Sequence, residues 1–249
     1  MTFAGAIAIF AQGSLNFTDQ QVKSGIQNAS DAIWHVWSPD LTNPASEYQG
    51  NTSATYNSTT GLGDYPVGTQ VYTGTLIGGY TTGGTSSSSW ANGANYSAAL
   101  YGAAGTGASG TAESGGLALL VGSLTPFSTA GSAHFAGLIA NAPINVFVPG
   151  TSFTGDQSIN AGNPNSATVE MAAWYNNGGT ITTLAQAIAS TVPYGEGNVF
   201  TVNNLGGGSV TPPNTLGGQG FSLVTVPEPS TIALGVMGAC AFLARRRKQ

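Results

Sequence analysis

The stretch ATVEMAAWY, residues 167–175, carries the clearest strand pattern in the chain. Because successive side chains of a β-strand point to opposite faces, one face takes Val169, Met171, Ala173 and Tyr175. The other face takes Thr168, Glu170, Ala172 and Trp174. Residues 176–179, NNGG, tolerate positive φ and predict a tight turn at the end of the strand. We interpret Glu170 as a charge on an exposed strand face.

Similar short apolar stretches recur on both sides, separated by Gly, Pro, Asn and Ser. Further strands are predicted at residues 14–18, 32–37, 69–77, 96–101, 116–124, 133–139, 144–148, 198–202 and 220–226. One short helix is predicted at residues 180–190, because Ile181, Leu184 and Ile188 follow Thr180 at helical spacing. The pattern predicts an all-β fold, an antiparallel β-sandwich with one short helix, for which closure into a jelly roll is an alternative. Residues 78–95 and 102–116 are low in complexity, and each is expected to form a mobile surface loop or a hairpin tip.

Composition excludes some classes of partner. Residues 1–225 hold nine acidic residues and a single base, Lys23, which gives a net charge of −8. Charged residues make up 6% of the chain, against about a quarter in typical soluble domains. Phosphate binding depends on cations, so the domain is not expected to bind nucleic acid. The single cysteine, Cys240, lies near the C-terminus and leaves the domain without a disulfide or a cysteine-based zinc site.

The N-terminus resembles the end of a signal peptide. Residues 1–11 are mostly small and apolar, and AQG at 11–13 fits a cleavage site before LNF at 15–17. The basic segment that opens a signal peptide is missing, since Lys23 is the first cation. We therefore expect a start upstream of Met1 or a truncated chain, and a buried N-terminal strand is the alternative.

The C-terminus combines an extended polar motif, an apolar run and a basic end. The motif is Val226, Pro227, Glu228, Pro229 and Ser230, and residues 231–244 follow without a charge. As a helix this run would span about 21 Å, short of the roughly 30 Å of a bilayer core, although snorkelling and bilayer thinning can close the gap. The chain then ends on four cations: Arg245, Arg246, Arg247 and Lys248. We predict a transmembrane helix with a cytoplasmic C-terminus, and a core helix is the alternative.

These residues resemble the PEP-CTERM sorting signal of Gram-negative bacteria. The resemblance covers residues 226–249 and implies processing by an exosortase, a membrane transpeptidase that cuts near the Pro-Glu-Pro element. Pro227, Glu228 and Pro229 would be recognised by that enzyme and would not perform catalysis. The resemblance also implies an association with exopolysaccharide and the extracellular matrix.

A second, looser resemblance covers residues 96–249. It is to the exported PEP-CTERM proteins of Verrucomicrobia and related bacteria, for which no activity is established. The segments that carry it are 96–102, 126–127, 147–150, 169–176, 197–202 and 219–223. The resemblance implies fold and location only.

No catalytic set is evident in the sequence. The chain has two histidines, His35 and His134, and no Gly-x-Ser-x-Gly, His-Glu-x-x-His or Walker motif. Its carboxylates are scattered, with no pair suggested by spacing for glycoside hydrolysis: Asp31, Asp40, Glu47, Asp64, Glu113, Asp156, Glu170 and Glu196. Asp156 lies among Gly and Asn residues, but the spacing matches no EF-hand. We expect no enzyme activity, no metal and no cofactor.

Aromatic residues give one alternative function. Sugar rings stack on exposed aromatic faces, although tryptophans more often fill a core. The four tryptophans are Trp34, Trp37, Trp90 and Trp174, of which Trp90, inside the polar loop, is the best candidate for exposure. A carbohydrate-binding module is therefore the first alternative, and a secreted hydrolase is the second.

The main prediction is an exported surface or extracellular-matrix protein in three parts. Residues 1–11 are the truncated signal peptide, 12–225 the extracellular β-sandwich domain and 226–249 the sorting signal. The expected partners are an exosortase, the membrane through residues 231–244 before processing, and exopolysaccharide.

Overall fold

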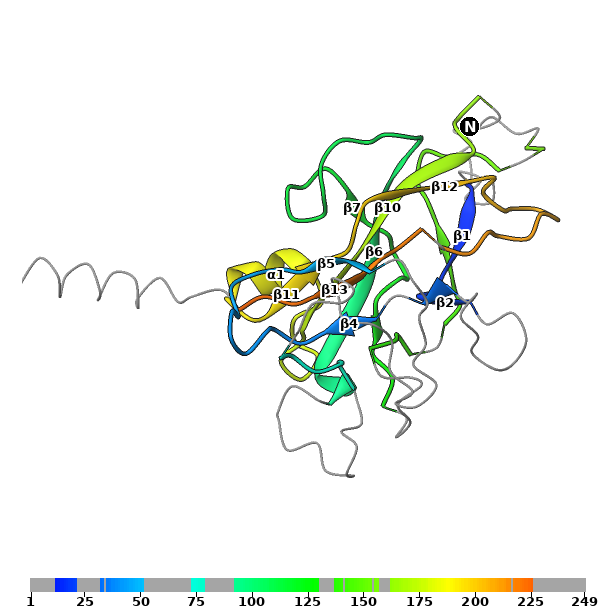
Figure 1. The fold of residues 1–249 in the computed structure, drawn as a ribbon. Coiled ribbons are helices and arrows are strands. Elements are labelled where there is room, and N and C mark those ends of the chain that lie inside the picture. Colours follow the sequence, from blue (N-terminus) through cyan, green and yellow to red (C-terminus); the bar gives the residue numbers. More distant parts are fainter. Residues whose placement is uncertain are drawn as a thin grey trace, which may run out of the picture.

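A computed structural model describes residues 12–21, 32–33, 35–51, 73–78, 92–129, 137–140, 142–153, 155–156, 162–215 and 217–225. Within these ranges the chain is built mostly of strands in antiparallel sheets, with one short α-helix (Figure 1). The predicted all-β, antiparallel character with one helix is confirmed for this part of the chain. Its closure into a sandwich or a jelly roll stays a prediction.

The largest sheet is organised around two long strands. β6, Tyr96–Ala104, pairs with β10, Ser166–Tyr175, in a continuous antiparallel register from Tyr96–Tyr175 to Ala104–Ala167. The free edge of β10 pairs with β11, Tyr194–Glu196, and β12, Phe200–Asn203. The outer edge of β6 pairs with β7, Ala118–Leu119, and β8, Thr125–Pro126.

The predicted alternation along β10 is confirmed. Val169, Met171 and Ala173 belong to the main core cluster, and Tyr175 packs against its edge. Ala172 and Trp174 belong to a second cluster on the opposite face. The period of two in residues 167–175 therefore predicts correctly which of these side chains lie on the same face of the strand. Both faces are covered by other parts of the chain.

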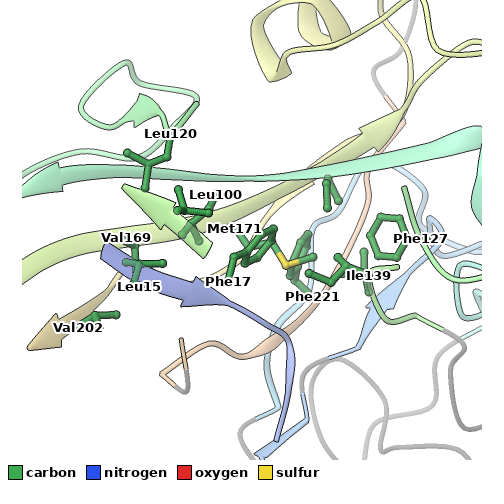
Figure 2. Packing of buried hydrophobic residues seen from close by; sticks show 14 of the residues in the cluster. Leu15, Phe17, Leu100, Leu120, Phe127, Ile139, Val169, Met171, Val202 and Phe221 are labelled. Carbon is green, nitrogen blue, oxygen red and sulfur yellow. The ribbon is translucent and has the colours of Figure 1, made fainter. Parts of the chain in front are cut away.

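The first face is covered by smaller sheets. β1, Ser14–Phe17, pairs with β9, Ile144–Phe147. β13, Gly220–Ser222, runs parallel to β4, Val36–Trp37, and antiparallel to β5, Gln49–Asn51. β2, Gln20–Gln21, pairs with β3, Ala32–Ile33, in a separate two-stranded sheet. Figure 2 shows apolar side chains of the main core cluster, among them Leu15 and Phe17 of β1, Leu100 and Met171 of the central sheet, and Phe221 of β13.

The second face is covered by the helix α1, Leu184–Ala189, and by residues 105–117. Thr183 caps the helix by accepting a hydrogen bond from the Gln186 N–H, which satisfies one of the free donors of the first turn. The predicted cap at Thr180 is wrong, because residues 177–180 continue the turn that follows β10 and the Thr180 hydroxyl donates to the Asn177 carbonyl.

Residues 102–104, predicted as part of a loop, instead complete β6. Beyond them the chain forms a mostly exposed connection between the paired strands β6 and β7, which agrees with the predicted surface loop or hairpin tip; its mobility stays a prediction. This segment packs on the second cluster through Ala108 and Ala112. The apolar residues of this segment are few, but its backbone N–H groups are held by carboxylates of the central sheet. Of the predicted strand 69–77, residues 69–72 lie outside the described residues, and residues 73–77 form no strand but one isolated bridge, from Leu76 to Trp37. Most of the predicted strand 133–139 and most of the loop 78–95 lie outside the described residues.

Candidate functional site

Glu170 is buried at the centre of the second face. It stands on β10 between Thr168 and Ala172, and its side chain is 1% exposed. The Ala112 N–H donates to its Oε2 at 2.7 Å. The prediction of an exposed Glu170 is therefore wrong, because the segment around Ala112 folds over this face of the strand.

Three more glutamates, from other segments of the chain, lie close enough to Glu170 for their charges to act on it. We call these four residues the glutamate cluster: Glu47, Glu113, Glu170 and Glu196. Glu196 of β11 pairs with Ala172 of β10, so its side chain shares the face of Glu170. Its carboxylate accepts the Glu113 N–H, and its own N–H donates to Glu47 Oε1 at 2.6 Å. Each of these bonds joins two segments that are far apart in the sequence.

Two neutral side chains also form hydrogen bonds with residues of the cluster. Tyr194 donates its hydroxyl to Glu113 Oε1 at 3.0 Å. Gln49 donates from Nε2 to the Glu196 carbonyl at 2.7 Å. Neither Lys nor Arg occurs among the described residues, so the carboxylates are satisfied there by N–H and O–H donors.

This environment raises the pKa values of Glu47, Glu170 and Glu196. Burial is the main cause that raises the pKa of Glu170 to about 8, and the charges of Glu196, Glu47 and Glu113 add to it. The hydrogen bond from the Ala112 N–H lowers this pKa but does not outweigh them. Burial and the neighbouring Glu196 raise the pKa of Glu47 to about 7. Burial and Glu113 raise the pKa of Glu196, and burial and the same carboxylate raise that of Tyr194 to about 12. Like charges in a desolvated place favour the neutral acid, so Glu170 and Glu47 hold protons near neutral pH.

The cluster can therefore exchange protons, and a protonated carboxyl next to an ionised one is the arrangement that glycoside hydrolysis uses. Within the described ranges no group of three or more His, Cys, Asp or Glu side chains is placed to hold a metal ion. Sequence reasoning missed this cluster because its members lie on four separate segments. The one available signal was Glu170, a single acid inside an otherwise uncharged strand.

The other predicted candidates that the structure describes do not join this cluster. His35 is buried beside β4, and His134 lies outside the described residues. Trp37 and Trp174 are 4% and 0% exposed, and the Trp174 indole donates to the Ile181 carbonyl at 3.0 Å. These two are core residues and offer no stacking face. Trp34 and Trp90 lie outside the described residues.

The folded domain continues up to the C-terminal motif. Thr225 is the last described residue, and its N–H donates to the Pro44 carbonyl at 2.7 Å. Val226 to Ser230, the predicted membrane run 231–244 and the basic residues Arg245 to Lys248 lie outside the described residues. Across the described ranges, no helix is long and apolar enough to span a bilayer.

Comparison with known proteins identifies the C-terminal segment. Residues 225–248 match the model of the PEP-CTERM protein-sorting motif. No curated protein and no solved structure matches the chain. The chain therefore carries a C-terminal PEP-CTERM sorting motif, which marks it as an exported protein directed to the cell surface through recognition by an exosortase.

Proposed function

We propose that this chain is a surface or extracellular-matrix protein whose domain, residues 12–225, reaches the cell exterior and is separated from its sorting signal there. The observation that carries the proposal is the motif match at residues 225–248. Before processing, residues 231–244 anchor the chain in the membrane, and the four terminal cations hold the C-terminus in the cytoplasm.

The domain itself is proposed to be a non-catalytic component of the matrix, associated with exopolysaccharide or biofilm. Its composition supports this role, since a surface rich in Gly, Ser, Thr and Asn and poor in cations is hydrated mainly by hydroxyl and amide groups. The absence of lysine and arginine from the described residues also disfavours binding to anionic polymers.

Cell fractionation tests the proposal. Cells with an active exosortase should release the domain or display it at the surface, and Glu228→Ala should accumulate as an unprocessed precursor in the membrane fraction. Glu113→Ala, which also removes one acid, serves as the control and should be sorted like the wild type. Equal distribution of the wild type and Glu228→Ala would exclude sorting through the motif.

Binding to polysaccharide is tested separately. Pull-down with the exopolysaccharide of the producing cells should retain the mature wild-type domain. If the carbohydrate-binding alternative holds, Trp90→Ala should lose this retention, whereas Trp174→Phe, a change inside the core, should keep it in any molecule that is folded.

A secreted glycoside hydrolase is the second candidate function, and the glutamate cluster is the observation that favours it. A buried acid with a pKa of about 8 next to a second carboxylate has the properties of a general acid at neutral pH. Glu170→Gln and Glu196→Gln should then each abolish the release of reducing sugar from a polysaccharide substrate. Asp40→Asn, in a different turn, should leave that release unchanged.

A further inference from the structure

The strand that leads into the sorting motif lies inside the fold. β13 has β4 on one side and β5 on the other, and Phe221 and Leu223 are both fully buried. The Leu223 N–H donates to the Trp37 carbonyl at 2.9 Å. The chain is therefore fixed in the core up to Leu223.

The next two residues are held at the surface by a separate set of bonds, which we call the C-terminal tether. The Val224 N–H donates to the Tyr194 carbonyl at 2.7 Å, and the Tyr194 N–H donates back to the Val224 carbonyl at 3.2 Å. The Thr225 N–H and hydroxyl both donate to the Pro44 carbonyl, at 2.7 and 3.2 Å. Val224 and Thr225 are partly exposed, unlike Leu223.

The tether leaves no spacer between the domain and the motif. Thr225 is the first residue of the motif match, and Pro227 is two positions further. Two extended residues reach about 7 Å, whereas a domain of this size has a radius of gyration of about 17 Å. The motif therefore begins within about 7 Å of chain from a residue that is hydrogen-bonded to the domain. Enzymes that cut chains act on exposed, accessible segments or on transiently opened ones.

We propose that the C-terminal tether regulates processing of the sorting motif, so that Val224 and Thr225 must leave Tyr194 and Pro44 before the exosortase can engage the motif. β13 and Leu223 stay in place during this step, because the side chains of Phe221 and Leu223 are in the core. Release of the tether lets about 14 Å of extended chain separate Leu223 from Pro227. This inference rests on the proposed function, since it concerns the rate of exosortase processing.

A pulse-chase experiment on the full chain, in cells with an active exosortase, tests the proposal. A spacer of about six Gly and Ser residues, which gives about 13 Å of added reach, is inserted between Thr225 and Val226. The matched control carries the same spacer in the exposed turn at Gly178 and Gly179. We expect the first insertion to speed conversion of the precursor about fivefold or more, the equivalent of one net backbone hydrogen bond, and the control to leave the rate unchanged.

A variant outside the motif tests release of the tether without lengthening the chain before the motif. Asp40 accepts hydrogen bonds from the backbone and hydroxyl of Thr42 and from the Thr73 hydroxyl, and so holds the turn that carries Pro44. Asp40→Ala should loosen this turn and speed conversion, without any change in the length or sequence of the motif. Hydrogen exchange of the purified precursor should also show faster exchange at the Val224 and Thr225 amides than at Leu223.

The outcomes distinguish the two proposals. If the wild type, the Thr225–Val226 insertion and Asp40→Ala are all processed at the same rate, the proposed role of the tether is wrong, although sorting through the motif still holds. Equal protection of the Val224, Thr225 and Leu223 amides also overturns it. If neither the wild type nor any variant is processed, so that all of them behave like Glu228→Ala, the proposed function is refuted. The proposed role of the tether is then refuted as well.

Discussion

Replacement of Glu170 by glutamine should remove a large part of the pH dependence of stability. Glu170 is 1% exposed, and its pKa lies at about 8 in the folded protein, against an ordinary value of 4.5. Between these two pH values the folded chain keeps a proton that the unfolded chain releases. Stability is therefore fully present below about pH 4.5 and falls as the pH rises through 8.

The size of the effect follows from the same two values. The interval between 4.5 and about 8, at about 1.4 kcal/mol per pH unit, sets an upper bound of about 5 kcal/mol on the loss. Relaxation of the segment around Ala112 and protonation of the neighbouring glutamates reduce it, so we expect about 2–4 kcal/mol. Glu170→Gln keeps an oxygen that can accept the Ala112 N–H but has no proton to lose.

Urea unfolding of the full chain in mild detergent, at several pH values between about 5 and 8.5, measures this difference. The free energy of unfolding of the wild type should fall by about 2–4 kcal/mol more than that of Glu170→Gln over this range. Asp40→Asn is the control. Burial acts to raise the pKa of Asp40, but hydrogen bonds from Thr73, Thr42 and Asn43 outweigh it and lower that pKa. Asp40→Asn should therefore be less stable than the wild type at every pH, while its free energy of unfolding falls with rising pH as steeply as that of the wild type. Parallel curves for the wild type and Glu170→Gln would refute the electrostatic account of the cluster.

Two further predictions concern buried hydrogen bonds. Trp174→Phe removes the bond to the Ile181 carbonyl and part of the side-chain volume under α1, and should cost about 2–4 kcal/mol in urea unfolding; a cost below about 0.5 kcal/mol would contradict tight packing of this face. Thr215→Val keeps the shape but removes a hydroxyl that accepts the Thr18 N–H at 2.9 Å and donates to the Thr18 carbonyl at 2.7 Å. It should lower the melting temperature, with a cost of about 1–3 kcal/mol, and an unchanged melting temperature would show that water replaces both bonds.

Strands β6, β7, β10 and β12 of the largest sheet overlap predicted strands because each carries its own local signal, whereas β8 and β11 were not predicted. The period of two in residues 167–175 gave the two faces of β10, and glycine and asparagine after Tyr175 marked its end. The helix α1 was also predicted, but its start was placed three residues early. Thr180 and Thr183 are equally good caps by residue type, and only the turn that follows β10 decides between them.

The glutamate cluster could not be predicted, because it depends on contacts between segments that are far apart in the chain. Glu47, Glu113, Glu170 and Glu196 have no fixed spacing, and a glutamate in a strand is most often exposed. The segment around Ala112 looked too polar to pack. It is held in place by hydrogen bonds from its backbone to Glu170 and Glu196, and composition does not show such bonds.

The sorting motif, unlike the glutamate cluster, could be predicted from the sequence, because it is recognised by the order of its residues alone. Val226 to Ser230, the apolar run and the four terminal cations can be read without knowledge of the fold, and the motif match covers nearly the same residues. What the sequence did not indicate is how closely the fold approaches the motif. The bonds of Thr225 and Val224 to Pro44 and Tyr194 became visible only in the structure.

Mass spectrometry of the mature protein tests the central claim most directly. The chain should be isolated from the surface and the medium of cells with an active exosortase, and its C-terminal peptide identified. Sorting through the motif predicts a new C-terminus near Pro227, Glu228 and Pro229 and the loss of residues 231–249. A mature protein that still ends at Gln249 in those cells would contradict the claim.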